Sequence, residues 1–151
     1  MGRKVVVCLG NPLRADDGLG LKVGRELEKR GHKVISPGPD LTEIAKELNE
    51  IEELILVDAM DFGGEPGEIV CARLDELREV EFRSSTHTLS PLKFLRLFKE
   101  LYGLPREVFI IGVQPGDLGY GEHLSPEVER AVQRVVEAIS ERVGNDREFE
   151  D

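Results

Sequence analysis

The fold is decided by residues 4–20, which read KVVVCLGNPLRADDGLG. Residues 4–9 are almost all apolar and mostly β-branched, a pattern typical of a strand that is buried on both faces of a parallel sheet. The Gly-Asn-Pro sequence at residues 10–12 ends this strand. An amphipathic helix is predicted at residues 18–30, because apolar side chains recur there at four-residue spacing: Leu19, Val23 and Leu27. Gly31 is expected to cap it.

The alternation of strands and helices continues along the chain. Further strands are predicted at residues 32–35, 54–57, 68–74 and 108–113, with a turn forced by Ser36-Pro37-Gly38-Pro39. Further helices are predicted at residues 40–49, from Ser90-Pro91 to Gly103 with Leu95, Phe98 and Leu101 facing the core, and from Ser125-Pro126 to Gly144.

This order of elements indicates an α/β fold of three layers. We expect a mostly parallel, five-stranded twisted sheet with helices on both faces and right-handed crossovers. The short, hairpin-like spacing around residues 68–74 suggests that one strand is antiparallel. The length predicts a single domain over residues 1–144, followed by a charged, poorly structured tail at residues 145–151.

Composition and charge exclude several functions. The formal charge of −10 argues against nucleic acid as a partner, because proteins that bind phosphate backbones collect Lys and Arg. With 33% charged residues and no long apolar run, membrane insertion is not expected. We interpret the chain as cytoplasmic, since no signal-peptide pattern precedes the first strand. Cys8 and Cys71 stand alone in apolar runs and are expected to behave as free thiols.

Three groups of polar residues follow predicted strands or precede a helix. Asp16-Asp17 follows the first strand, Asp58 ends the strand at 54–57, and His87 lies in the loop before the Ser90 helix. Ligands of open α/β sheets collect at the carboxyl ends of the strands, so these side chains are expected to converge. Two carboxylates and an imidazole suit a divalent transition metal such as nickel or zinc and leave coordination positions open.

Each of these residues also has a structural interpretation. Asp16 or Asp17 could cap the following helix, Asp58 could satisfy loop amides, and His87 could be a hydrogen-bonded loop histidine. We interpret His32 and His123 as structural. The glycines of residues 116–121 lack the spacing of a dinucleotide-binding motif and are expected to form a turn-rich loop.

Four sequence blocks resemble one known family. The segment at residues 9–20 is similar to the signature of the nickel-hydrogenase maturation endopeptidases, which opens with Gly-Asn and continues to an acidic pair. Residues 54–61 together with Pro66-Gly67-Glu68-Ile69 resemble the second block, Ser85-Thr86-His87 the third, and Gly112-Val113-Gln114-Pro115 the fourth. The resemblance covers nearly the whole chain and is closest to the branch that serves formate-hydrogenlyase-type, membrane-bound hydrogenases.

The resemblance implies a function and a set of site residues. The family removes the C-terminal extension of the nickel-loaded large-subunit precursor of nickel-iron hydrogenase, which would be the partner here. The metal-contacting residues of the family correspond to Asp17, Asp58 and His87, the same three that the residues themselves suggest. The nickel would be carried by the substrate, with no permanently bound cofactor in the peptidase. Many members carry Asp-Gly-Gly where this chain has Ser36-Pro37-Gly38-Pro39, which leaves only Gly38, and Asp40 as a stand-in for the acid.

Three other functions remain open at this stage. A self-sufficient metallohydrolase would hold its own zinc through the same residues, and a nickel chaperone would bind the metal without cutting a bond. A flavin or nucleotide module of similar fold is a third alternative, because fold alone does not decide function. We expect substitution of Asp17 or His87 to abolish processing without unfolding the protein, since both are predicted to lie in loops outside the core.

Overall fold

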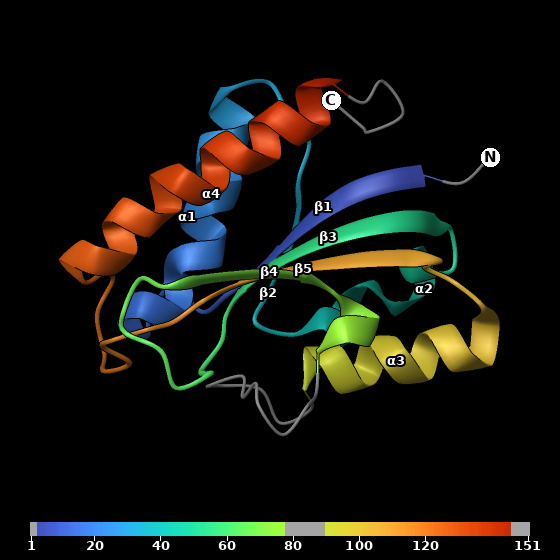
Figure 1. The fold of residues 1–151 in the computed structure, drawn as a ribbon, viewed down its shortest axis with the longest axis horizontal. Coiled ribbons are helices and arrows are strands. Elements are labelled where there is room, and N and C mark those ends of the chain that lie inside the picture. The colour runs from blue at the N-terminus through green and yellow to red at the C-terminus, as the bar shows by residue number, and fades with distance from the viewer. Residues whose placement is uncertain (1–2, 78–89, 146–151) are drawn as a thin grey trace.

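The computed structural model describes residues 3–77 and 90–145, and it contains one five-stranded sheet in the order β2-β1-β3-β5-β4 (Figure 1). The strands are β1 (Arg3–Leu9), β2 (Ile35–Gly38), β3 (Ile51–Ala59), β4 (Ile69–Arg73) and β5 (Glu107–Val113). All neighbouring strands pair in parallel except β4, which is antiparallel to β5. The predicted α/β class, the five strands and the one antiparallel strand are therefore confirmed.

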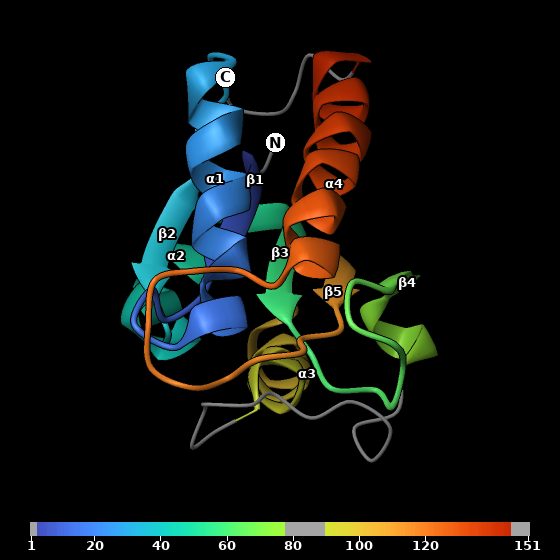
Figure 2. The same cartoon turned by 90° about the vertical axis from the view of Figure 1, so that its left-hand side faces the viewer.

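Helices cover both faces of the sheet (Figures 1 and 2). On one face lie α1 (Leu19–Lys29) and α4 (Pro126–Asn145), and on the other lie α3 (Pro91–Tyr102) and the single-turn helix α2 (Ala45–Leu48). The central strands β1 and β3 send alternate side chains into two separate cores. Val6, Cys8, Ile55 and Val57 pack against α1 and α4, whereas Val5, Val7, Leu54 and Leu56 pack toward α2 and α3. Burial on both faces explains the continuous apolar runs of these strands.

Strand β2 differs from the prediction. The sequence places a strand at residues 32–35 and a turn after it, but the strand begins at Ile35 and includes Ser36, Pro37 and Gly38. Proline is tolerated because β2 is an edge strand, where one row of backbone groups has no partner to pair with. Leu9 pairs with Gly38, and the Gly10 amide donates to the Gly38 carbonyl over 3.0 Å, which ties the segment to the end of β1.

Several helix boundaries and faces also differ. The predicted helix at residues 40–49 is a 3-10 turn (Leu41–Ile44) followed by α2, although Asp40 does cap it through the Thr42 amide. Helix α4 continues through Gly144 instead of ending there. Leu101 is 64% exposed and not in the core. Each step of three residues along a helix stops about 60° short of a full turn, so Leu101 has rotated away from the buried Leu92 and Leu95.

Other predicted helix signals are confirmed. Ser90 caps α3 by accepting from the Lys93 amide, and Gly103 ends the helix with a φ of 76°. Gly31 follows α1 with a φ of 91°. Within residues 3–77 and 90–145, no helix is both long and apolar enough to cross a membrane.

Candidate active site

The turn that carries the acidic pair lies across the carboxyl ends of β1 and β3. A 3-10 turn, η1 (Ala15–Gly18), connects β1 to α1. The first turn of α1 then packs directly on the strand ends: a Cβ on Gly20 would collide with the Leu9 carbonyl oxygen and lie 3.2 Å from that of Val57. Glycine at this position therefore allows the close approach that places Asp17 at the edge of the sheet.

Asp17 is fully buried, although it belongs to a turn. Its Oδ2 accepts a hydrogen bond from the Asn11 amide over 3.1 Å, and the same amide also donates to the Asp17 carbonyl over 3.1 Å. The segment between the two residues thus folds back on itself and encloses the carboxylate. The expectation that Asp17 lies outside the core is wrong, because this loop is packed against the strand ends and not projected into solvent.

Asp16 forms different contacts from those of Asp17. Its Oδ2 accepts from the amides of Gly116 and Asp117 over 2.8 and 2.7 Å and from the Ser125 hydroxyl over 2.6 Å, while Oδ1 accepts from the Ser125 amide over 2.7 Å. Neither aspartate caps α1, whose N-cap is Gly18 without a side-chain bond. Asp16 instead organises the distant loop between β5 and α4, so one acid of the pair is structural.

Asp58 lies at the same edge of the sheet, near the carboxyl end of β3. It is the second-last residue of that strand, one position later than the predicted strand end, and it pairs with Gly112 of β5. The side chain is fully buried, and Oδ1 accepts from the Ala59 amide over 2.9 Å. By alternation along β3 it shares a face with Leu54 and Leu56, the face that α3 covers.

His87 lies outside the described residues, so its position relative to the two carboxylates stays a prediction. The chain segment that contains it leads into α3, which packs on the face of the sheet where Asp58 points. Among residues 3–77 and 90–145, no three His, Cys, Asp or Glu side chains form a group that could hold a metal ion. Of the three predicted ligands, the described residues include Asp17 and Asp58, both fully buried.

Gln114 is a site residue to which the sequence patterns assigned no role. It directly follows β5 and is 7% exposed. Its Oε1 accepts from the amides of Phe62 and Gly64 over 2.9 and 3.1 Å, and its Nε2 donates to Asp61 Oδ1 over 3.1 Å. Gln114 thereby fixes the loop that follows Asp58. In the sequence, the signal that could have identified Gln114 is a single polar residue directly after a buried strand.

The loop between β5 and α4 is cross-linked by further polar contacts. Asp117 accepts from the Gly119 amide over 2.8 Å and lies 2.7 Å from His123 Nε2. These contacts, the one to His123 first, lower the pKa of Asp117. The glycine-rich segment is therefore a turn-rich loop, as predicted, and it lies beside the start of α1 (Figure 2).

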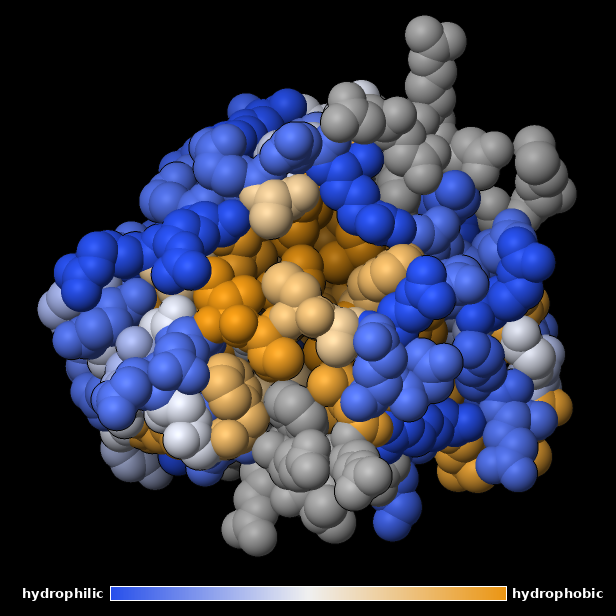
Figure 3. Space-filling view, viewed as in Figure 1, coloured by the Kyte–Doolittle hydropathy of each residue, from blue (hydrophilic) through white to orange (hydrophobic). Residues whose placement is uncertain are grey.

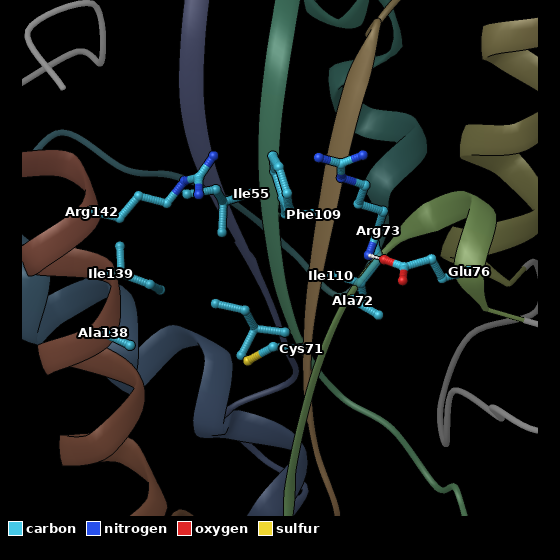
Figure 4. A pocket seen from close by; sticks show the side chains of 11 residues that line it. Ile55, Cys71, Ala72, Arg73, Glu76, Phe109, Ile110, Ala138, Ile139 and Arg142 are labelled. Carbon is cyan, nitrogen blue, oxygen red and sulfur yellow. Dashed lines mark hydrogen bonds between the residues drawn. The ribbon is translucent and has the colours of Figure 1, made fainter.

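The most apolar cavity of the described chain lies away from this edge. Figure 3 shows apolar side chains gathered in a hollow, and Figure 4 shows that they come from α4 and from strands β3, β4 and β5. The cavity measures about 330 Å³ and includes Cys71, Phe109 and Ile139. Burial raises the pKa of the Cys71 thiol, which keeps it protonated and weakly nucleophilic at neutral pH. The hollow therefore contains no evident catalytic group.

The chain is similar to known proteins over most of its length. A family model described as hydrogenase maturation protease matches residues 4–142. FrxA of Pyrococcus furiosus is 33% identical over 129 residues, which cover 82% of this chain and 93% of that protein. The hydrogenase 3 maturation protease of Escherichia coli K12 is 31% identical over 147 residues, covering 93% and 91%.

A solved structure of a hydrogenase maturation protease is also similar to this chain. The NiFe hydrogenase maturation protease HybD from Thermococcus kodakarensis superimposes with a TM-score of 0.79 at 32% identity, covering 93% of this chain and 98% of that one. The match extends over the sheet and over every segment that contributes to the carboxyl edge. The chain belongs to the hydrogenase maturation proteases, a family of endopeptidases.

Proposed function

We propose that this protein removes the C-terminal extension of a nickel-iron hydrogenase large-subunit precursor after nickel has been inserted. We further propose that Asp17, Asp58 and His87 contact the nickel, which arrives as part of the substrate. The observation that carries the proposal is that two carboxylates from separate segments, Asp17 after β1 and Asp58 near the end of β3, are both fully buried at the carboxyl ends of neighbouring strands. The names of the relatives, hydrogenase 3 and NiFe hydrogenase maturation proteases, support this substrate class.

The chemistry of the two carboxylates suits a shared metal. Buried anionic groups are costly unless they are hydrogen-bonded, paired with a charge or bound to a metal. Carboxylate and imidazole ligands bind divalent ions more weakly than a cage of thiolates does, so the precursor's own ligands would keep the nickel. Through such a transient contact the peptidase would detect the nickel without removing it from the precursor.

Cleavage needs a water molecule and a proton acceptor at the scissile peptide. Substrate-borne nickel would supply Lewis-acid chemistry to that peptide or to the water. The carboxylates of Asp17 and Asp58 would position the water and accept its proton, which makes the protein an aspartate-dependent endopeptidase. The hydrogen bonds from Asn11 to Asp17 and from Ala59 to Asp58 hold both side chains in fixed orientations for this role. We place the reaction in the cytoplasm, where free cysteines such as Cys8 and Cys71 are usual.

The decisive experiment compares two forms of the precursor. Nickel-loaded and nickel-free precursor are incubated identically with the protein, and the mass of each is measured. We expect trimming of the nickel-loaded form only, and no rescue when nickel is added to a precursor whose metal-binding cysteines have been removed. Equal trimming of both forms would contradict the role of substrate nickel.

Metal analysis of the purified protein separates the alternatives. Substrate-borne nickel predicts little metal in the isolated peptidase, together with reversible binding of added nickel, zinc or cadmium. A stoichiometric zinc ion that survives chelators would favour a self-sufficient metallohydrolase. Nickel binding without any loss of precursor mass would favour a chaperone.

A further inference from the structure

Two large apolar side chains project from the loops that surround the acidic turn. Tyr120 is 93% exposed and Leu13 is 60% exposed. They lie on segments far apart in the sequence, but these segments are joined by backbone hydrogen bonds: the Gly121 amide donates to the Leu13 carbonyl over 3.0 Å, and the Ala15 amide donates to the Gly121 carbonyl over 2.8 Å. The two side chains thus belong to one surface, which we call the Leu13–Tyr120 surface.

This surface is rigid, which is unusual for a loop that presents apolar groups to water. Asp16 fixes both ends of the loop after β5 through its bonds to Gly116, Asp117 and Ser125. The Arg14 guanidinium donates twice to the Leu118 carbonyl, over 3.2 and 2.9 Å. A fixed aromatic group that lacks internal packing gains little for folding. The same group is well suited to binding, because it loses little conformational freedom when a partner covers it.

A groove of about 310 Å³ continues from this surface along α1. It is lined by Pro12 and Gly18 of the site loop, by Leu21 and Leu124, by the cationic side chains of Lys22, Arg25 and Lys29, and by the carboxylates of Glu26 and Glu122. Lys22 and Lys29 pair with Glu129 and Glu26, whereas Arg25 is exposed and forms no ion pair with any residue of the described segments. On a chain of charge −10, this groove offers a local cation to a partner.

We propose that the Leu13–Tyr120 surface is the docking surface for the folded body of the hydrogenase large-subunit precursor, with an acidic group of the precursor facing Arg25. This inference rests on the proposed function, because it takes the precursor as the substrate. This occupant follows from continuity: the loop that exposes Leu13 also holds Asp17, so a protein positioned with its metal at Asp17 lies next to the Leu13–Tyr120 surface. Aromatic side chains surrounded by polar groups are the usual anchors of such interfaces.

The test uses a double substitution and a matched control. Leu13→Ser with Tyr120→Ala removes the surface, and Leu97→Ser with Tyr102→Ala removes a similarly exposed leucine and tyrosine from the outer face of α3. Steady-state processing of nickel-loaded precursor gives kcat and KM, and thermal unfolding checks that each variant is folded. We expect the first variant to raise KM at least about tenfold with kcat within about twofold, and the control to leave both unchanged.

Direct binding separates this proposal from the proposed function. Asp17→Asn should still bind the nickel-loaded precursor measurably while failing to cut it, and adding the Leu13 and Tyr120 substitutions to Asp17→Asn should weaken that remaining binding about tenfold further. If the wild-type protein trims the precursor but the surface variant has an unchanged KM, or loses kcat instead, the docking proposal is wrong and the proposed function stands. If the wild-type protein does not trim the precursor at all, the proposed function itself fails.

Discussion

The carboxyl edge of the sheet and the apolar hollow between α4 and β4 are the two concave regions that differ most. At the edge, polar side chains are buried and saturated with hydrogen bonds, as Asp16 and Gln114 illustrate. In the hollow, aliphatic and aromatic groups lie open, with the Arg142 guanidinium 4.2 Å from the centre of the Phe109 ring. The edge contains buried carboxylates, whereas the hollow is lined mainly by apolar side chains.

The difference teaches that the apolar cavity and the cluster of buried polar side chains occupy separate places in this fold. A large apolar pocket is the usual first hypothesis for a binding site. In an open parallel sheet, however, loops from neighbouring strands converge at the carboxyl ends, and reactive groups collect there. Asp58, near the carboxyl end of β3, follows this rule, whereas the hollow faces the middle of β5. Variants in the two regions should therefore have effects of different kinds.

The largest effect is expected for Asp17→Asn. The substitution keeps the shape of a buried side chain but removes its charge, so processing of nickel-loaded precursor should fall at least about 100-fold. The buried position makes asparagine a better choice than alanine, which would leave a cavity. Initial rates by mass spectrometry give the measurement, and Asp117→Asn, on an exposed loop, serves as the control. A rate within twofold of wild type would remove Asp17 from the site.

A smaller effect, on stability, is expected for Asp16→Ala. This change leaves the amides of Gly116, Asp117 and Ser125 without their acceptor, at a cost of about 1 kcal/mol for each lost bond. We expect the free energy of unfolding to fall by about 3 kcal/mol, measured by urea titration. An unchanged urea midpoint would show that the loop between β5 and α4 does not depend on this carboxylate.

The smallest effect is expected for Arg142→Ala in the hollow. The partly exposed guanidinium lies over the Phe109 ring and forms a 2.8 Å ion pair with the buried Glu53, which also pairs with Lys4. Its loss should lower the free energy of unfolding by about 1 kcal/mol and leave processing unchanged. A large loss of processing by a folded Arg142→Ala protein would contradict this expectation and would show that the hollow takes part in substrate handling.

The sequence predicted the architecture because the signals for it are local. Apolar runs, four-residue spacing and the Ser-Pro helix starts depend on neighbours in the chain, and they gave the strands and most of the helices correctly. The shift of β2 to Ile35–Gly38 was missed because its signal is not local. Proline normally argues against a strand, and only the pairing of Leu9 with Gly38 at the sheet edge explains it.

The roles of individual site residues were harder to predict for the same reason. Asp16 and Asp17 are identical in type and adjacent, yet one bonds a loop about 100 positions away and the other bonds Asn11, six positions earlier. No pattern in residues 9–20 distinguishes them without the family resemblance. The roles of Asp17 and Asp58 as metal contacts stay predictions, and so does that of His87, which lies outside the described residues.

The contacts of Asp16 with residues far along the chain also bear on the order in which the molecule folds. Its partners Gly116 and Ser125 are 100 and 109 positions further along the chain, and Ser125 directly precedes α4. The acidic turn can reach its final shape only after β5 and the following loop have been synthesised and have docked. Contacts of such large sequence separation form late in folding. Until Ser125 has been synthesised, Asp16 therefore lacks some of the donors that hold it in the finished fold.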